Sequence, residues 1–160
     1  MIGRFDSTCP CHLKGNIMKP YRKFKPFQIR WKETMGDPKN PYLYRWTFIF
    51  FNFSFRIHHW LGSDDKRFFH DHPWNFISII LRGSYVNVTP EGRFPVKAIS
   101  IWKSTALKRH YLEIPKEGAW TLLICGRPYH KWAFWVDSKK YRPLRYFHKF
   151  GGSACNLNKV

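Results

Sequence analysis

The string FFHDHPWNF at residues 68–76 holds the side chains of this sequence that are best suited to chemistry. On a β-strand, residues two apart project from the same face, so His70 and His72 would point together while Asp71 points away. Two neutral imidazoles on one face can share a divalent metal ion, and a third ligand from another strand would complete the site. The alternative is a pair of ordinary hydrogen-bonded histidines that bind no metal.

Such a site needs neighbouring strands, and the sequence has the pattern for them. From Tyr42 onward, short runs of aromatic and β-branched residues are separated by segments rich in Gly, Pro, Asp and Ser. These runs predict strands at 43–51, 53–60, 76–82, 84–89, 96–102, 110–114, 119–125, 130–136 and 144–150. No window shows a helical period over ten residues. The sequence therefore predicts an all-β, single-domain, mostly antiparallel sandwich or barrel.

The stretch RIHHWLGSDDKRFFHDHPWNFISIILRGSY resembles the first sequence motif of the cupin superfamily. It is similar in particular to a group of small, little-characterised bacterial and phage cupins that carry the string HDHPW. His70 and His72 match the two histidines of the motif, and Gly83 matches its last glycine. Asp64 stands where the motif has its first glycine, and Phe76 stands where it has a metal-binding glutamate.

The second cupin motif matches through His110 alone, which corresponds to its metal-binding histidine. The segment WTLLICGRPYHKWAFWV at 120–136 also resembles the HDHPW group, so the resemblance covers roughly residues 40–150. It implies a jelly roll with a metal site of His70, His72 and His110 between the sheets. Asn75 and Ser78 are the nearby polar candidates for a fourth contact.

Three-histidine sites in cupins hold Fe(II) in some dioxygenases, so the resemblance favours iron over zinc, manganese or nickel. It implies a metal-dependent, oxygenase-like enzyme that acts on a small molecule. Many cupins, however, have lost the metal and serve as binding pockets or structural shells, so a metal-free protein is the alternative.

Other polar side chains are expected at the mouth of the barrel. Arg56 and His58 share one face of the predicted strand 53–60, Arg82 ends the strand 76–82, and Tyr85 lies in the next strand. An arginine in a pocket recognises carboxylate or phosphate through its planar fork of donors, so we expect a small anionic ligand. Outward-facing arginines are the alternative.

The net charge of the chain suggests a second class of function, the binding of an anionic partner. The sequence has 28 Lys and Arg against 10 Asp and Glu, a net charge of +18, which favours anionic partners. The segment YRKFKPFQIRWK at 21–32 interleaves cations and aromatic rings as nucleic-acid contacts do. Its candidate phosphate contacts are Arg22, Lys23, Lys25, Arg30 and Lys32.

The alternative function is thus a non-catalytic binder of a nucleotide or nucleic acid, for example a phage protein that sequesters or modifies a host nucleotide. A segment that packs over the barrel is the other interpretation of this basic strip, and a purely structural scaffold is a third role.

The cysteines suggest a further site. A structural zinc ion could join the two ends of the chain through Cys9, Cys11, His12 and Cys155, although reduced, unpaired thiols fit the spacing better. Cys125 lies in an apolar strand and is predicted to belong to the core.

The sequence divides into a basic N-terminal arm (1–41) with one short strand at 27–31, a cupin-like barrel (42–150) and a C-terminal tail (151–160). The longest apolar run, at 47–55, is shorter than the roughly 20 residues that cross a bilayer. There is no apolar signal region at the N-terminus, so we expect a cytoplasmic protein, of a bacterial or phage-infected cell, with no membrane contact. A homodimer is the default expectation.

Overall fold

A computed structural model describes residues 26–151, which form eleven strands and one helix. The larger, eight-stranded sheet consists of β1 (Phe27–Asp37), β2 (Asn40–Phe50), β3 (Phe53–Trp60), β5 (Phe76–Thr89), β6 (Gly92–Lys97), β7 (Ile101–Ser104), β8 (Tyr111–Glu113) and β9 (Ala119–Cys125). The smaller sheet consists of β4 (Phe69–His70), β10 (Phe134–Val136) and β11 (Lys139–Tyr141). The helix α1 spans Pro143–Phe150.

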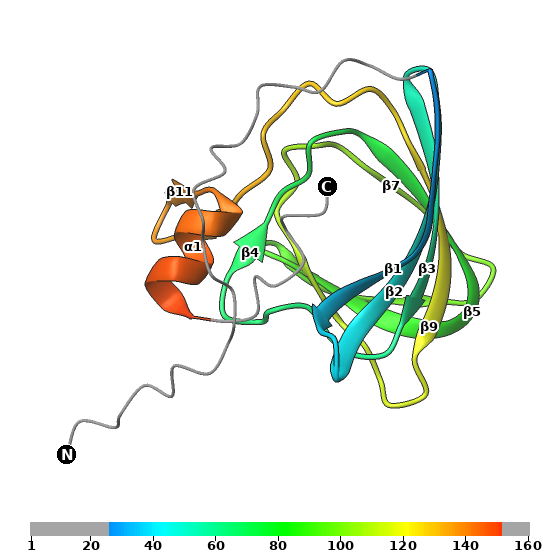
Figure 1. The fold of residues 1–160 in the computed structure, drawn as a ribbon. Helices are drawn as coiled ribbons and strands as arrows, with labels where there is room; N and C mark the ends of the chain where they lie inside the picture. Colours follow the sequence, from blue (N-terminus) through cyan, green and yellow to red (C-terminus); the bar gives the residue numbers. More distant parts are fainter. Residues whose placement is uncertain (1–25, 152–160) are drawn as a thin grey trace.

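The strands pair only antiparallel, which confirms the predicted all-β jelly roll. The larger sheet has the order β1-β2-β3-β9-β5-β6, with β7 and β8 also pairing with β5, and the smaller has the order β11-β10-β4. The larger sheet curves around a space whose opposite side is formed by β4 and its neighbouring segments (Figure 1). The candidate site lies between these two layers.

The sheet begins inside the segment assigned to the arm. The short strand predicted at 27–31 extends to Asp37 as β1, which pairs along its length with β2. Residues 1–25 and 152–160 lie outside the described part of the chain.

The two strands predicted at 76–82 and 84–89 are one continuous strand, β5, so the turn expected around Gly83 is wrong. Gly83 has a φ of +79°, and the register against β9 shifts between Ile80 and Arg82. The backbone therefore bends without reversing, as at a β-bulge. The first half of β5 pairs with β7 and β9, and the second half pairs with β6 and β8, so this one strand joins both parts of the barrel.

The strand predicted at 144–150 is wrong, because these residues form α1. Pro143 occupies the first turn, where its fixed φ favours a helix and its missing N–H costs nothing. Tyr146 is fully buried and stacks on Phe134 of β10 at 3.9 Å between ring centroids. The Tyr146 hydroxyl donates to Asp65, 2.8 Å away, which ties the helix to the loop before β4. Within residues 26–151 there is no helix with the length and apolar character to cross a bilayer.

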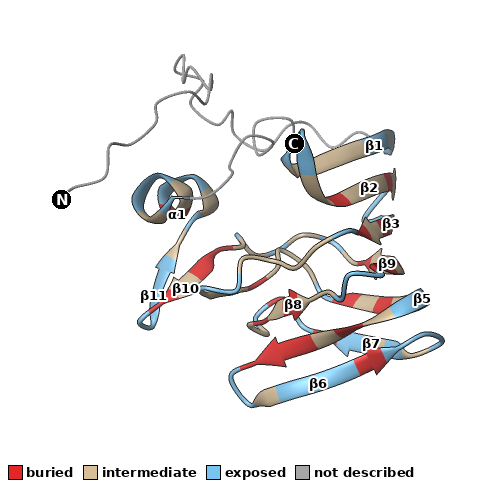
Figure 2. Ribbon diagram, turned by 90° about the horizontal axis from the view of Figure 1, so that it is seen from below, coloured by how far each residue is buried: buried red, intermediate tan, exposed pale blue. Residues whose placement is uncertain are grey.

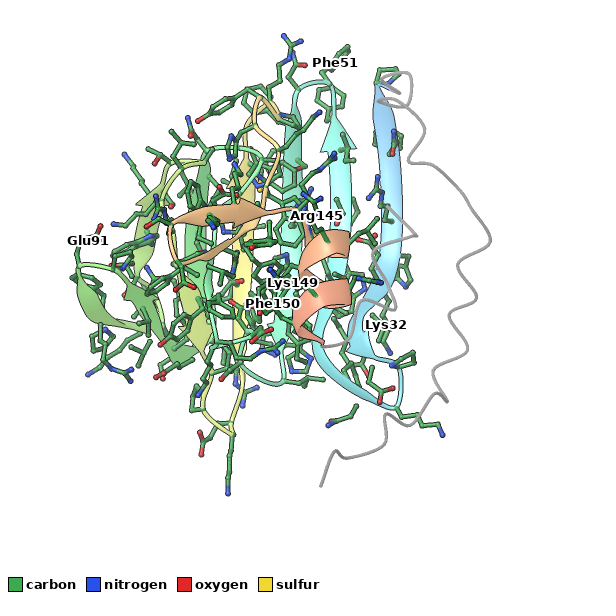
Figure 3. The ribbon with its side chains drawn as sticks, turned by 90° about the vertical axis from the view of Figure 1, so that its left-hand side faces the viewer. Lys32, Phe51, Glu91, Arg145, Lys149 and Phe150 are labelled. Carbon is green, nitrogen blue, oxygen red and sulfur yellow. The ribbon has the colours of Figure 1, made fainter. Side chains whose placement is uncertain are left out.

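The inner face of the larger sheet combines a hydrophobic cluster, which includes Leu43, Trp60 and Ile80, with a group of buried polar residues. These polar residues include Thr47, His58, Ser78 and Thr121. The register places Phe27 beside Phe50 and Phe50 beside Phe53, and all three rings are exposed. Figure 2 shows how buried and exposed residues alternate along the strands, and in Figure 3 Phe51 marks the end of the sheet at the β2–β3 turn. A group of buried polar residues is costly to fold and indicates a binding cavity.

Gly83 provides a test of the bend in β5. A Cβ atom at this position would lie 2.4 Å from the carbonyl oxygen of Gly118, at a φ that L-residues rarely adopt. We expect Gly83→Ala to lower the free energy of unfolding by more than about 2 kcal/mol in urea denaturation. Gly126→Ala is the matched control, because a Cβ there meets its nearest atom at 3.7 Å and should change stability by less than about 0.5 kcal/mol. Equal effects of the two substitutions would contradict the role of Gly83.

Candidate metal centre

The structure brings together the three histidines predicted to bind metal. Each of His70, His72 and His110 offers one ring nitrogen, and these three atoms lie within 4.8 Å of one another. His70 ends β4 and forms an isolated antiparallel bridge with His110, each backbone N–H donating to the other residue's carbonyl at 2.9 Å. The backbone N–H of His72 donates to the carbonyl of Ala106, also at 2.9 Å.

The local geometry differs from the one predicted. The strand β4 contains only Phe69 and His70, so His72 lies in the turn that follows rather than on the same strand. Strand alternation therefore does not by itself bring the two imidazoles together. They converge because the bridge to His110 holds one of them and the contact with Ala106 holds the other.

Asp71 points away from the cavity, as predicted, and anchors the histidine segment from behind. Its side chain is fully buried and accepts hydrogen bonds from the backbone N–H of Ala133 at 2.7 Å and from Trp135 Nε1 at 2.9 Å. His130 Nε2 lies 3.0 Å and Lys140 Nζ 3.1 Å from the same carboxylate. A buried carboxylate with this many partners fixes the backbone on which the two histidines are mounted.

The hydrogen bonds of His110 prepare it as a ligand. Its Nδ1 lies 2.6 Å from Asn87 Oδ1, which can only accept, so Nδ1 carries the proton. The other nitrogen, Nε2, lies 2.7 Å from Nε2 of His72. A carbonyl-type acceptor behind a histidine is the usual arrangement for orienting a metal-binding imidazole.

Burial keeps these rings neutral. Loss of solvent, followed by the influence of neighbouring imidazoles, holds the pKa of both His72 and His110 well below the usual histidine range. Metal binding requires the unprotonated imidazole, so both ligands are already in the correct form at neutral pH.

The three histidines open onto a cavity of about 70 Å³. A single water molecule needs about 10–15 Å³ by the same measure, so the space suits a metal ion and a ligand of a few atoms. Among the other lining residues are His58, Asp64, Phe76, Ser78, Tyr85 and Trp102.

Two of the four predicted substrate-binding residues, His58 and Tyr85, line this cavity and are buried. Arg56 lies beside the cavity, with its guanidinium 4.0 Å from the centre of the Trp74 ring and its Nε 3.3 Å from the Ser54 hydroxyl. Arg82 is exposed and does not line the cavity. The bulge after Ile80 interrupts the alternation of β5 and turns Arg82 outward.

Only one of the two residues suggested for a fourth metal contact lines the cavity. Ser78 lines the cavity, whereas the Asn75 side chain accepts hydrogen bonds from the Ala106 N–H and the Tyr129 hydroxyl. Phe76, which replaces the glutamate of the cupin motif, lies edge-on to His72 with 4.9 Å between ring centroids. An apolar ring, as noted from the sequence, therefore occupies the position at which the cupin motif has a carboxylate ligand.

Asp64 is a cavity residue that the sequence did not single out. It lies in the segment LGSDDK, between the predicted strands 53–60 and 76–82. Its Oδ2 accepts a hydrogen bond from the Leu112 N–H at 2.9 Å, and burial raises its pKa while nearby His70 opposes that shift. Its position in place of the first motif glycine was the one available signal.

Most of the remaining predicted site residues lie outside the described part of the chain. The zinc candidates Cys9, Cys11, His12 and Cys155 lie outside the described residues, as do Arg22, Lys23 and Lys25. Of the basic strip, Arg30 pairs with Glu33 at 3.8 Å and Lys32 lies 4.9 Å from the Tyr44 ring centre (Figure 3 labels Lys32). Binding of nucleic acid stays a prediction. Cys125 is fully buried, as predicted for a core residue.

The neutral histidines make stability depend on pH. Their pKa values are lowered on folding, so the unfolded chain takes up protons first as the pH falls through about 6.5. We expect the free energy of unfolding of the metal-free protein to fall between about pH 7.5 and pH 5.5, by up to about 1.4 kcal/mol per pH unit for each of His58, His72 and His110. Urea denaturation at several pH values measures this slope.

Replacement of one buried histidine, in His58→Phe, should reduce this slope. The control His148→Gln, which changes an exposed residue of α1, should leave it unchanged. Stability that is flat across this pH range would contradict burial of neutral imidazoles.

The sequence matches no known family profile, and no curated protein is similar to it. Solved structures, in contrast, are similar in fold. AerE from Microcystis aeruginosa has a TM-score of 0.50 and 14% identity, over 70% of this chain and 55% of that chain. A sugar phosphate isomerase of the cupin superfamily from Silicibacter pomeroyi gives 0.49 and 11%, over 69% and 78%. An RmlC-like cupin from Shewanella frigidimarina gives 0.49 and 10%, over 64% and 95%. At this level of identity the likeness to AerE concerns the fold alone.

Proposed function

We propose that this protein is a metal-dependent cupin in which His70, His72 and His110 bind one divalent metal ion, preferably Fe(II), and that it catalyses an oxygenase-type reaction on a small anionic molecule. The observation that carries this proposal is the convergence of three ring nitrogens within 4.8 Å beside a cavity.

The donor set fits a transition metal. Neutral imidazole suits Fe, Zn, Cu and Ni better than Mg or Ca, which prefer oxygen ligands. Three protein ligands leave open positions, which is the arrangement of catalytic rather than structural sites. Iron is preferred because some cupin dioxygenases hold Fe(II) with the same set of ligands, three histidines.

When bound, ferrous ion would supply redox chemistry with oxygen and open positions for a ligand. The residues of the chain have separate tasks around it. Asn87 holds His110 with Nε2 toward the cavity, and the buried Asp71 fixes the backbone of the other two ligands. The Phe76 and Trp102 side chains line the cavity and exclude water. Asp64, with its raised pKa, can hold or release a proton within the cavity.

Charge supports the choice of an anionic substrate. The net charge of +18 would raise the local concentration of anions and speed their association. Arg56 lies on the inner face of β3, two residues before His58, and makes no ion pair within the described part of the chain. Its guanidinium is therefore available to an anion that approaches the cavity.

Metal binding by the purified full-length chain tests this proposal. Anaerobic titration of the metal-free protein with Fe(II), followed by elemental analysis after desalting, should give one ion per chain. We expect His72→Ala and His110→Ala each to weaken binding at least about 100-fold, because each removes a ligand. His148→Ala is the control, since this exposed histidine of α1 lies outside the cluster.

Far-ultraviolet circular dichroism and urea denaturation would establish that each variant is folded. A folded wild-type protein that retains no Fe(II), Zn(II), Mn(II) or Ni(II), or variants that bind metal as tightly as wild type, would contradict the proposed function.

A further inference from the structure

Buried polar atoms without a partner are concentrated at one place in the molecule. Within residues 26–151, such side-chain atoms are Nδ1 and Nε2 of His58 and Nε1 of Trp102. Both residues line the cavity onto which the three clustered histidines open. No other described side chain has a buried nitrogen or oxygen atom left without a hydrogen bond.

This concentration indicates a ligand. A buried donor or acceptor that is left unpaired costs the free energy of removing it from water, so folded proteins keep very few. Here both residues that carry such atoms line one cavity, which has room for several non-hydrogen atoms. The simplest account is that a bound molecule forms hydrogen bonds with Trp102 and with one nitrogen of His58.

The strand register places the two residues on opposite walls. Trp102 of β7 pairs with Ser78 of β5, which pairs with Leu123 of β9, which pairs with Arg56 of β3. His58 follows two residues along β3 on the same inner face as Arg56. The strands β3, β9, β5 and β7 succeed one another across the sheet (Figure 2), so a ligand above Ser78 and Leu123 has His58 and Trp102 on its two sides.

The chemistry of the groups selects the ligand. The Trp102 indole N–H only donates, so it needs an acceptor. The imidazole of His58 is neutral, because burial and the nearby Arg45 and Arg56 hold its pKa well below the usual range, and it offers one donor and one acceptor. These two ring nitrogens point away from each other, so one small molecule pairs with only one of them. The ligand must therefore carry an acceptor for Trp102 and a group that can donate to or accept from His58, such as a hydroxyl.

We propose that His58 and Trp102 form a subsite for a small hydroxycarboxylate. Its carboxylate accepts a hydrogen bond from Trp102 Nε1, and its hydroxyl pairs with one ring nitrogen of His58. The positive charge of Arg56, on the same strand face, favours the carboxylate. This assignment names the substrate class of the proposed metal-dependent function and rests on it only for what happens at the three clustered histidines.

The Trp102 indole N–H provides a direct readout. In the ¹⁵N-labelled full-length protein, Trp102→Phe identifies its indole cross-peak by loss. Glycolate is the probe, added separately to metal-free protein and to diamagnetic Zn(II)-loaded protein, with acetate as the analogue that lacks only the hydroxyl. We expect a saturable downfield shift of the Trp102 peak, with glycolate binding about tenfold more tightly than acetate.

The Trp135 indole is the internal control, because its Nε1 already donates to Asp71 at 2.9 Å and it does not line the cavity. Its peak should stay unchanged throughout the titration. His58→Phe should weaken glycolate binding at least about tenfold while one Zn(II) per chain is still bound. An unchanged glycolate affinity in this variant would overturn the subsite.

The two proposals fail separately. A Trp102 peak that does not move with glycolate in either the metal-free or the Zn(II)-loaded wild-type protein overturns the subsite, even if metal binds. A saturable shift in a protein that binds no metal supports the subsite and overturns only the metal-dependent function. Shifts of equal size at Trp102 and Trp135 would overturn specific binding in the cavity.

Discussion

The backbone bridge between His70 and His110 is the contact on which the candidate site depends. It joins two segments 40 residues apart in the sequence and places both imidazoles over the inner face of the larger sheet. The bridge is short, and the strand β4 beyond it contains only two residues. It is held from behind by Asp71, whose buried carboxylate binds the segment to β10 and β11. A site that needs ring nitrogens within a few ångströms cannot rest on a loosely held loop, and this carboxylate supplies the rigidity.

The cavity has an energetic cost that the rest of the fold must offset. Neutral histidines, unpaired ring nitrogens and a carboxylate with a raised pKa all lie inside the sheet, where apolar side chains would stabilise the protein more. The outer face of the same sheet is apolar and exposed at Phe50 and Phe53. Binding proteins often give up stability where they hold a ligand, so this distribution supports a functional rather than a purely structural barrel.

The sequence predicted both the fold class and the clustering of the three histidines. The two predictions had different sources. Short runs of β-branched and aromatic residues between turn residues indicated antiparallel strands, and the cupin resemblance selected His110 among the distant histidines. The helix α1 was missed because it is short and its apolar face consists of aromatic residues, which also favour strands. The turn expected at Gly83 was wrong because a glycine with positive φ serves a bulge as readily as a turn. Trp102 could not be found, since only the tertiary structure brings it to the cavity.

The central claim is that three histidines hold one metal ion in this cavity. A crystal structure of the Fe(II)-loaded protein, with anomalous diffraction data collected on both sides of the iron absorption edge, tests it most directly. We expect one anomalous peak about 2.0–2.2 Å from a ring nitrogen of each of His70, His72 and His110. An iron ion bound elsewhere, such as at His148, would contradict this site. Ordered histidines around a cavity with no anomalous peak would contradict it as well.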